Sequence, residues 1–307
     1  MNSSAYMPEG LRLNTEENKS MTQNIATLQT AKAQGIILEG IAVSCDSEHN
    51  LIVDIAGKRG IIPREECASG IASGKTRDIA ILSRVGKPVC FVVIEATEEK
   101  IILSRRIAQD FAQKTMLNEL KSGDIINALI THLEPFGAFV DIGCGVVSFI
   151  GIENISVSRI THPSERFHCG QLIHAVVLYT DNQTGRIHLT HRELLGTWEQ
   201  NANKFNSGET VRGIVRSIEP YGIFIELAPN LSGLSERKNN LNEGDAVSVY
   251  IKSIIPERMK IKLNVIDKLE KMPSKLNYFI TEGHIDKWIY SPECCETKYI
   301  ATSFSQD

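Results

Sequence analysis

The chain has 307 residues, of which 42% are hydrophobic and 23% are charged, and its formal net charge is −4. This length is enough for two or three domains with apolar cores. No stretch reaches the roughly 20 apolar residues of a membrane span, and residues 1–24 lack the apolar core of a signal peptide. The seven cysteines form no C-x-x-C pair, which favours reduced thiols. We therefore expect a cytoplasmic protein that does not enter a membrane.

The chain begins with residues 1–30, which we expect to be a loosely ordered, polar segment. Residues 31–106 then form the first of three similar units. In this unit Gly35 opens an apolar strand, and residues 51–55 (LIVDI) form the next one. The unit ends with a basic residue, Lys100, followed by a short apolar strand.

The second and third units, residues 121–192 and 207–266, resemble each other more closely. Residues 136–142 read FGAFVDI, and residues 221–227 repeat the pattern as YGIFIEL. Both motifs follow a Glu-Pro pair. Repetition at a fixed spacing indicates a tandem array of one structural unit.

Each unit of about 70 residues contains five short strands and little helix, which predicts a small closed barrel of the OB type. Apolar residues near helical spacing in 107–120 and 194–205 predict short helices between the units. In the C-terminal extension, residues 267–307, strands at 285–290 and 298–304 would form a hairpin. The predicted fold is therefore mainly β, with tandem five-stranded barrels joined by short helices.

Strand alternation predicts which aromatic side chains face outward. Aliphatic residues should fill each barrel, so Phe139 and Phe224 point to the outside. Phe136 and Tyr221 precede a glycine, where a strand bends easily, and would lie beside them. RNA bases stack on such rings for about 1–3 kcal/mol each. The alternative is that the rings pack under loops or against a neighbouring domain. The first unit has His49 and Ile52 at these positions, so we expect it to bind RNA weakly or to dock proteins.

Basic residues are a secondary feature. Arg186 and Lys260 occupy equivalent last-strand positions, and Arg192 and Lys262 lie close to them. All four are candidates for phosphate contacts, although a solvated barrel edge would explain them equally well. Segmental net charges range only from −2 to +1. Stacking should therefore contribute a large share of any RNA affinity.

Histidines are concentrated in the middle unit, which holds six of the eight. Their protonation below about pH 6.5 would add positive charge and strengthen RNA binding. His162, His168, Cys169 and His174 are conceivable zinc ligands, but their spacing matches no standard structural site. We expect neither a metal nor a cofactor.

These motifs resemble the S1-type RNA-binding domain, which takes its name from a protein of the bacterial small ribosomal subunit. The resemblance covers about 35–105, 121–192 and 207–266, and it is weakest in the first unit. It implies five-stranded antiparallel barrels, binding of single-stranded messenger RNA and association with the small ribosomal subunit. The three-unit length resembles a short bacterial version. The histidine that the family often carries at the end of the third strand is replaced here by Gly151.

The chain shows no nucleotide-binding loop, metalloprotease helix or hydrolase nucleophile motif. We therefore expect a non-enzymatic protein that acts in translation. The alternatives are an RNA-gripping accessory subunit of an RNA degradation or transcription complex, and a protein-docking scaffold.

Overall fold

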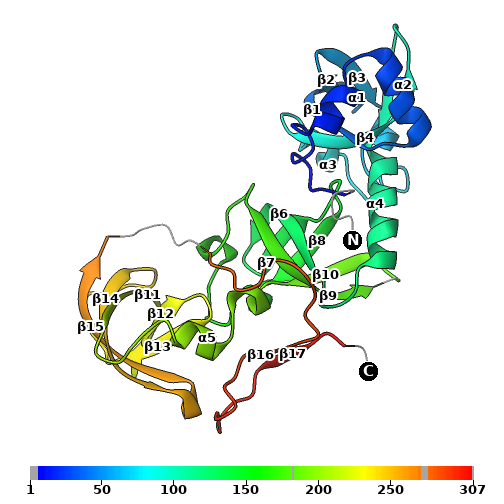
Figure 1. The fold of residues 1–307 in the computed structure, drawn as a ribbon. Helices are drawn as coiled ribbons and strands as arrows, with labels where there is room; N and C mark the ends of the chain where they lie inside the picture. The colour runs from blue at the N-terminus through cyan, green and yellow to red at the C-terminus, as the bar shows by residue number, and fades with distance from the viewer. Residues whose placement is uncertain (1–5, 182, 271–275, 306–307) are drawn as a thin grey trace.

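The computed structural model describes residues 6–181, 183–270 and 276–305. It contains three closed five-stranded barrels, which Figure 1 shows as a bent row with the second barrel in the middle. In each barrel the strands follow one order, in which the fifth strand lies between the third and the fourth. All strand pairs are antiparallel except that between the third and fifth strands. The predicted mainly-β fold of tandem barrels is confirmed.

Barrel 1 consists of β1 (Leu38–Cys45), β2 (Leu51–Ile55), β3 (Lys58–Ile62), β4 (Pro88–Ala96) and β5 (Ile101–Ser104). Barrel 2 consists of β6 (Ile125–Glu134), β7 (Gly137–Asp141), β8 (Val147–Gly151), β9 (Leu172–Asp181) and β10 (Arg186–Thr190). Barrel 3 consists of β11 (Thr210–Glu219), β12 (Gly222–Ala228), β13 (Leu231–Ser235), β14 (Ala246–Ile255) and β15 (Lys260–Leu269).

Helices connect the barrels, as predicted. The long helix α4 (Arg105–Glu119) leaves barrel 1 and reaches barrel 2 (Figure 1). Its N-cap is Ser104, whose hydroxyl accepts the backbone N–H of Ile107. A single turn of 3₁₀ helix and the short α5 (Trp198–Ala202) join barrel 2 to barrel 3. In barrel 1 the connection between β3 and β4 carries the short helix α3 (Ile79–Leu82).

The barrel cores follow the period-two alternation of the strands. In barrel 2, Ala138 and Val140 are fully buried, and Ile223 and Ile225 take the same places in barrel 3. In barrel 1 the corresponding interior contains Leu51 and other aliphatic side chains. Small interiors of this kind are filled entirely by side chains, so the outer faces carry the functional surface.

The N-terminal segment is ordered over residues 6–30, so the prediction of a loose segment is corrected there; residues 1–5 lie outside the described residues. Two helices form, α1 (Glu16–Met21) and α2 (Ile25–Gln34), and α2 has a capping box between Asn24 and Thr27. The carboxylate of Glu39 accepts backbone N–H groups from Gly10, Arg12 and Leu13. Polar composition suggested disorder, but these buried hydrogen bonds fix the segment on barrel 1.

The C-terminal extension forms the predicted hairpin in a shorter version, with β16 (Lys287–Ile289) antiparallel to β17 (Ala301–Ser303). Before the hairpin the chain contacts barrel 2, where the backbone N–H of Ile285 donates to the carbonyl of Gly123. Trp288 and Tyr290 are buried in the core cluster of barrel 3. Within the described residues, no helix is both long and apolar enough to cross a membrane.

Candidate nucleic-acid interface

Barrel 2 carries a cluster of three aromatic rings on its outer face. Phe136 is 57% exposed, and its ring lies edge-on to that of Phe139 at a centroid distance of 6.2 Å and an angle of 89°. The ring of Phe149 on β8 completes the cluster, at 5.1 Å from Phe139 and 5.7 Å from Phe136. The two phenylalanines chosen from the sequence therefore lie together, and Phe149 was missed. Alternation around the buried Ser148 and Ile150 would have placed it outward.

Barrel 3 repeats the arrangement. The ring of Tyr221, which is 69% exposed, lies 6.2 Å from that of Phe224 at an angle of 89°. This is the same geometry as that of Phe136 and Phe139. Leu234 takes the place of Phe149, so barrel 3 has two rings where barrel 2 has three.

The glycine after the first aromatic residue allows this packing. A Cβ atom on Gly137 would lie 2.4 Å from the Ile150 carbonyl oxygen and 2.4 Å from the Phe149 ring. On Gly222 it would lie 2.6 Å from the Ser235 carbonyl oxygen. The third strand can therefore come this close only to a glycine. The outward side chain of the third strand then reaches the aromatic pair.

Phe139 and Phe149 belong to a single row of side chains that crosses all five strands of barrel 2. His132 on β6 lies opposite Phe139, and Phe139 lies opposite Phe149. Phe149 is in register with His188 on β10, which in turn lies opposite Tyr179 on β9. Residues directly opposite each other on adjacent strands share a face and contact one another. Every member of this row is therefore an outward aromatic or histidine side chain.

The same row has a different chemistry in each of the other barrels. Barrel 3 has one ring, one leucine, one cation and two serines there, in the order Ser217, Phe224, Leu234, Lys262, Ser253. Barrel 1 has three isoleucines and no ring, in the order Ser44, Ile52, Ile61, Ile102, Glu95. Base stacking therefore has its largest platform on barrel 2 and none in the row of barrel 1.

Residues 119–192, which form barrel 2 with the end of α4, match the family model described as S1 RNA binding domain. Barrel 2 is the part of the chain that this family model covers. The chain also resembles the small ribosomal subunit protein bS1 of Leuconostoc lactis, with 29% identity over 73% of this chain and 55% of that protein. The bS1 homolog of Bacillus subtilis (strain 168) is 31% identical over 73% of this chain and 61% of its own length. The chain spans about three-fifths of the length of these curated relatives.

Among solved structures, a multidomain protein with nucleic acid binding domains from Streptococcus pneumoniae TIGR4 matches 78% of this chain and 76% of its own. Its sequence identity is 13% and its TM-score is 0.26, a likeness too weak to bear on function.

The four basic residues predicted to contact phosphates differ in their surroundings on barrels 2 and 3. Lys262 lies in the row itself, next to Leu234, and is exposed. Lys260 and Arg186 are exposed at the starts of β15 and β10. The guanidinium of Arg192, in contrast, donates to the carboxylate of Glu193 and to the hydroxyl of Thr302. Arg192 therefore helps to hold the C-terminal hairpin, which makes it the weakest phosphate candidate of the four.

The acidic residue two positions after Phe139 and after Phe224 lies on the same outer face of its strand as that ring. It is nevertheless buried, because another part of the chain covers it. Asp141 of barrel 2 accepts hydrogen bonds from the backbone N–H groups of Glu9, Gly143 and Gly145. Burial, together with the nearby charge of Glu9, raises the pKa of Asp141 to about 7.

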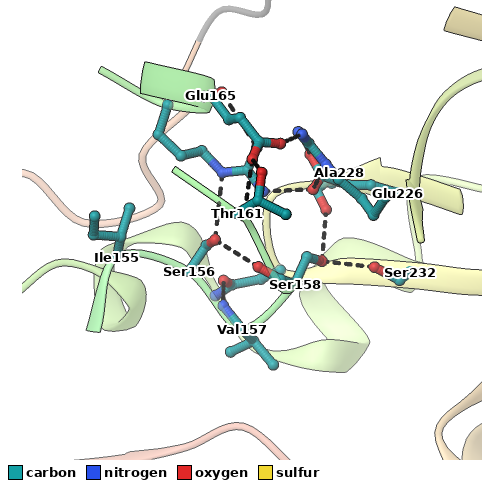
Figure 2. Close-up of polar contacts among 12 residues, drawn as sticks. Ile155, Ser156, Val157, Ser158, Thr161, Glu165, Glu226, Ala228 and Ser232 are labelled. Carbon is teal, nitrogen blue, oxygen red and sulfur yellow. Dashed lines mark hydrogen bonds and ion pairs between the residues drawn. The ribbon is translucent and has the colours of Figure 1, made fainter. Parts of the chain in front are cut away.

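In barrel 3 the equivalent acid, Glu226, joins the two barrels. Its carboxylate accepts hydrogen bonds from Arg166 of barrel 2 at 2.5 Å and from Arg216 of β11 at 2.7 and 3.1 Å. Arg216 also pairs with Glu165. Figure 2 shows Glu165 and Glu226 at this junction, with Ser158 bonded to Ser232 beside them at 2.8 Å. Buried ion pairs at this junction therefore fix barrel 2 against barrel 3.

Six histidines in the middle unit were expected to become charged below pH 6.5, but His191 is fully buried and His174 is half-buried. The pKa of His191 is lowered to about 4, mainly by burial. A hydrogen bond to the Ile155 carbonyl opposes this shift, and the charges of Arg166 and His174 add to it. Burial also lowers the pKa of His174. These two therefore add little charge to an RNA-binding surface at pH 6.

The buried His191 makes stability depend on pH. Because its folded-state pKa lies below the unfolded value of about 6.5, the unfolded chain binds a proton first, and stability falls as the pH drops from 6.5 toward 4. We expect its contribution to decrease by about 2 kcal/mol between pH 7 and pH 5. Urea unfolding of wild type and His191→Gln at both pH values measures this, with the exposed His168→Gln as control. An equal pH dependence in wild type and His191→Gln would contradict the expectation.

Across the described ranges 6–181, 183–270 and 276–305, no three His, Cys, Asp or Glu side chains are grouped so that they could hold a metal ion. Accordingly, the side chains of His162, His168, Cys169 and His174 are not gathered into such a group.

Proposed function

We propose that this chain binds single-stranded RNA by stacking bases on the outer faces of barrels 2 and 3. The observation that supports this most directly is the repetition of one exposed ring pair, with the same 6.2 Å spacing and 89° angle, in two barrels. Exposed rings are costly in water unless a ligand covers them. The S1 family match of barrel 2 supports RNA as that ligand.

The bS1 names of the curated relatives support a role in translation, with messenger RNA on the small ribosomal subunit as the partner in the cytoplasm. In this proposal the chain is a binding protein and not an enzyme. Barrel 1, with isoleucines in place of rings, would dock a protein partner instead of RNA. Co-sedimentation with small ribosomal subunits tests the ribosomal role, and binding only to an RNA degradation or transcription complex would favour the accessory-subunit alternative.

The RNA-binding face is tested by the double variant Phe139→Ala/Phe224→Ala. Each loss of a stacking ring is expected to weaken binding about tenfold, and together about a hundredfold because the rings lie on separate barrels. The measurement is a titration of fluorescent single-stranded RNA, with the matched duplex as a second ligand.

The matched control is Phe111→Ala, which removes an exposed phenylalanine from α4, outside both rows. It should bind RNA as wild type does. If the folded double variant binds as tightly as wild type, or if wild type prefers the duplex, the stacking proposal is wrong and the exposed rings are better explained as protein contacts.

A further inference from the structure

Two members of the row on barrel 2 lie outside the cluster of Phe136, Phe139 and Phe149. Tyr179 on β9 and His188 on β10 stack face to face, with centroids 4.4 Å apart and planes at 18°. Tyr179 is 47% exposed, and His188 is half-buried. A stacked pair of this kind also strengthens the pairing of its two strands.

The position of this pair connects it to the aromatic cluster. His188 is in direct register with Phe149 on the neighbouring parallel strand. Adjacent strands lie about 4.8 Å apart, so the ring pair begins one strand away from the cluster and ends two strands away. The outer face of barrel 2 therefore offers rings on four consecutive strands, in the order β7, β8, β10 and β9.

We propose that Tyr179 and His188 form a second base-stacking site, continuous with the cluster of Phe136, Phe139 and Phe149. An RNA strand that places bases on the cluster would continue across β10 and β9 and place further bases on this pair. The ligand is the nucleobase itself, since rings accept any base on their faces. This inference rests on the proposed RNA-binding function and extends the site across the barrel.

Comparison of the three barrels indicates that the second site is a property of barrel 2 alone. The two positions are Ser253 and Lys262 in barrel 3, and Glu95 and Ile102 in barrel 1. A lysine in the row suits a phosphate, whereas a tyrosine and a histidine suit a base. Barrel 2 would thus supply base-dependent affinity, and barrel 3 would combine stacking with a phosphate contact.

The test is a titration of the full chain and its Tyr179→Ala/His188→Ala variant with two RNAs at one salt concentration. One is a dodecameric oligouridylate, and the other is an abasic strand of the same length. The variant is expected to bind the oligouridylate about tenfold more weakly and the abasic strand equally well, because only bases stack. Tyr179→Phe, which keeps the ring, should restore wild-type binding of the oligouridylate in the presence of His188. Tyr250→Ala removes an exposed tyrosine outside the row of barrel 3 and is the matched control.

The outcomes separate this inference from the proposed function. If Tyr179→Ala/His188→Ala binds oligouridylate like wild type while Phe139→Ala binds more weakly, the second site does not exist and the pair serves only strand pairing. An equal loss on the abasic strand would likewise overturn base stacking at this pair. If wild type binds neither strand, the proposed function itself fails. A melting temperature close to that of wild type verifies that the variant is folded.

Discussion

Replacing Glu226 with alanine is expected to lower the free energy of unfolding by about 3–5 kcal/mol. The side chains of Arg166 and Arg216 are 1% and 6% exposed, and Glu226 is their shared carboxylate. Without it, two guanidinium groups stay buried with one less counter-charge, and burial already lowers the pKa of Arg166. Loss of one partner from a buried ion pair is far more costly than loss of a surface pair. The measurement is urea unfolding of the full chain, monitored with a probe that reports on barrels 2 and 3.

The matched control for this prediction is Glu236→Ala in the same barrel. Glu236 pairs with Lys252 at 3.1 Å, and its side chain is 83% exposed, so its removal should cost less than about 1 kcal/mol. A second variant replaces all three buried residues, Arg166, Arg216 and Glu226, with apolar side chains of similar size. It should regain much of the lost stability, since the desolvation cost of the charges also disappears. Equal unfolding midpoints for Glu226→Ala and Glu236→Ala would refute the buried junction.

Replacing Glu9 with alanine is expected to release the N-terminal segment from barrels 1 and 2 and to cost about 3–5 kcal/mol. Its carboxylate accepts two hydrogen bonds from Arg105, at 2.6 and 2.9 Å, and both side chains are 5% exposed. Arg84 contacts the same carboxylate at 3.3 Å, and the backbone N–H of Cys90 donates to it at 3.1 Å. Burial disfavours its charge, but the adjacent Arg105 outweighs that effect and lowers the pKa of Glu9.

Hydrogen exchange is the most direct measurement for Glu9→Ala. The amides of Gly10, Arg12 and Leu13 donate to Glu39, and we expect their protection to fall as the segment detaches. Glu16→Ala is the control, because Glu16 is 94% exposed and pairs with the surface residue Lys19. Unchanged protection over residues 6–13 in Glu9→Ala would mean that the segment is held by other contacts.

The repeat, the barrel fold and the outward direction of the main aromatic residues are predictable from the sequence. These are local properties. Side-chain direction in a strand has a period of two, so Ala138 and Val140 had to face inward if the barrel was to have a core, and Phe139 outward. The motif glycines are also local signals, and the close approach of β8 to Gly137 explains why no larger residue fits there.

The sequence does not predict which outward residues lie together or which of them are covered, because both depend on contacts between distant segments. Phe149, His188 and Tyr179 come from three strands, and they form one row because of inter-strand register, which alternation along a single strand does not specify. Asp141 and Glu226 obey alternation and face outward, yet Glu9 and Arg166 from distant segments bury them. The order of residues 6–30 has the same origin, since its polar groups find partners on barrels 1 and 2. Docking between segments far apart in sequence depends on complementary surfaces that exist only after the barrels have folded.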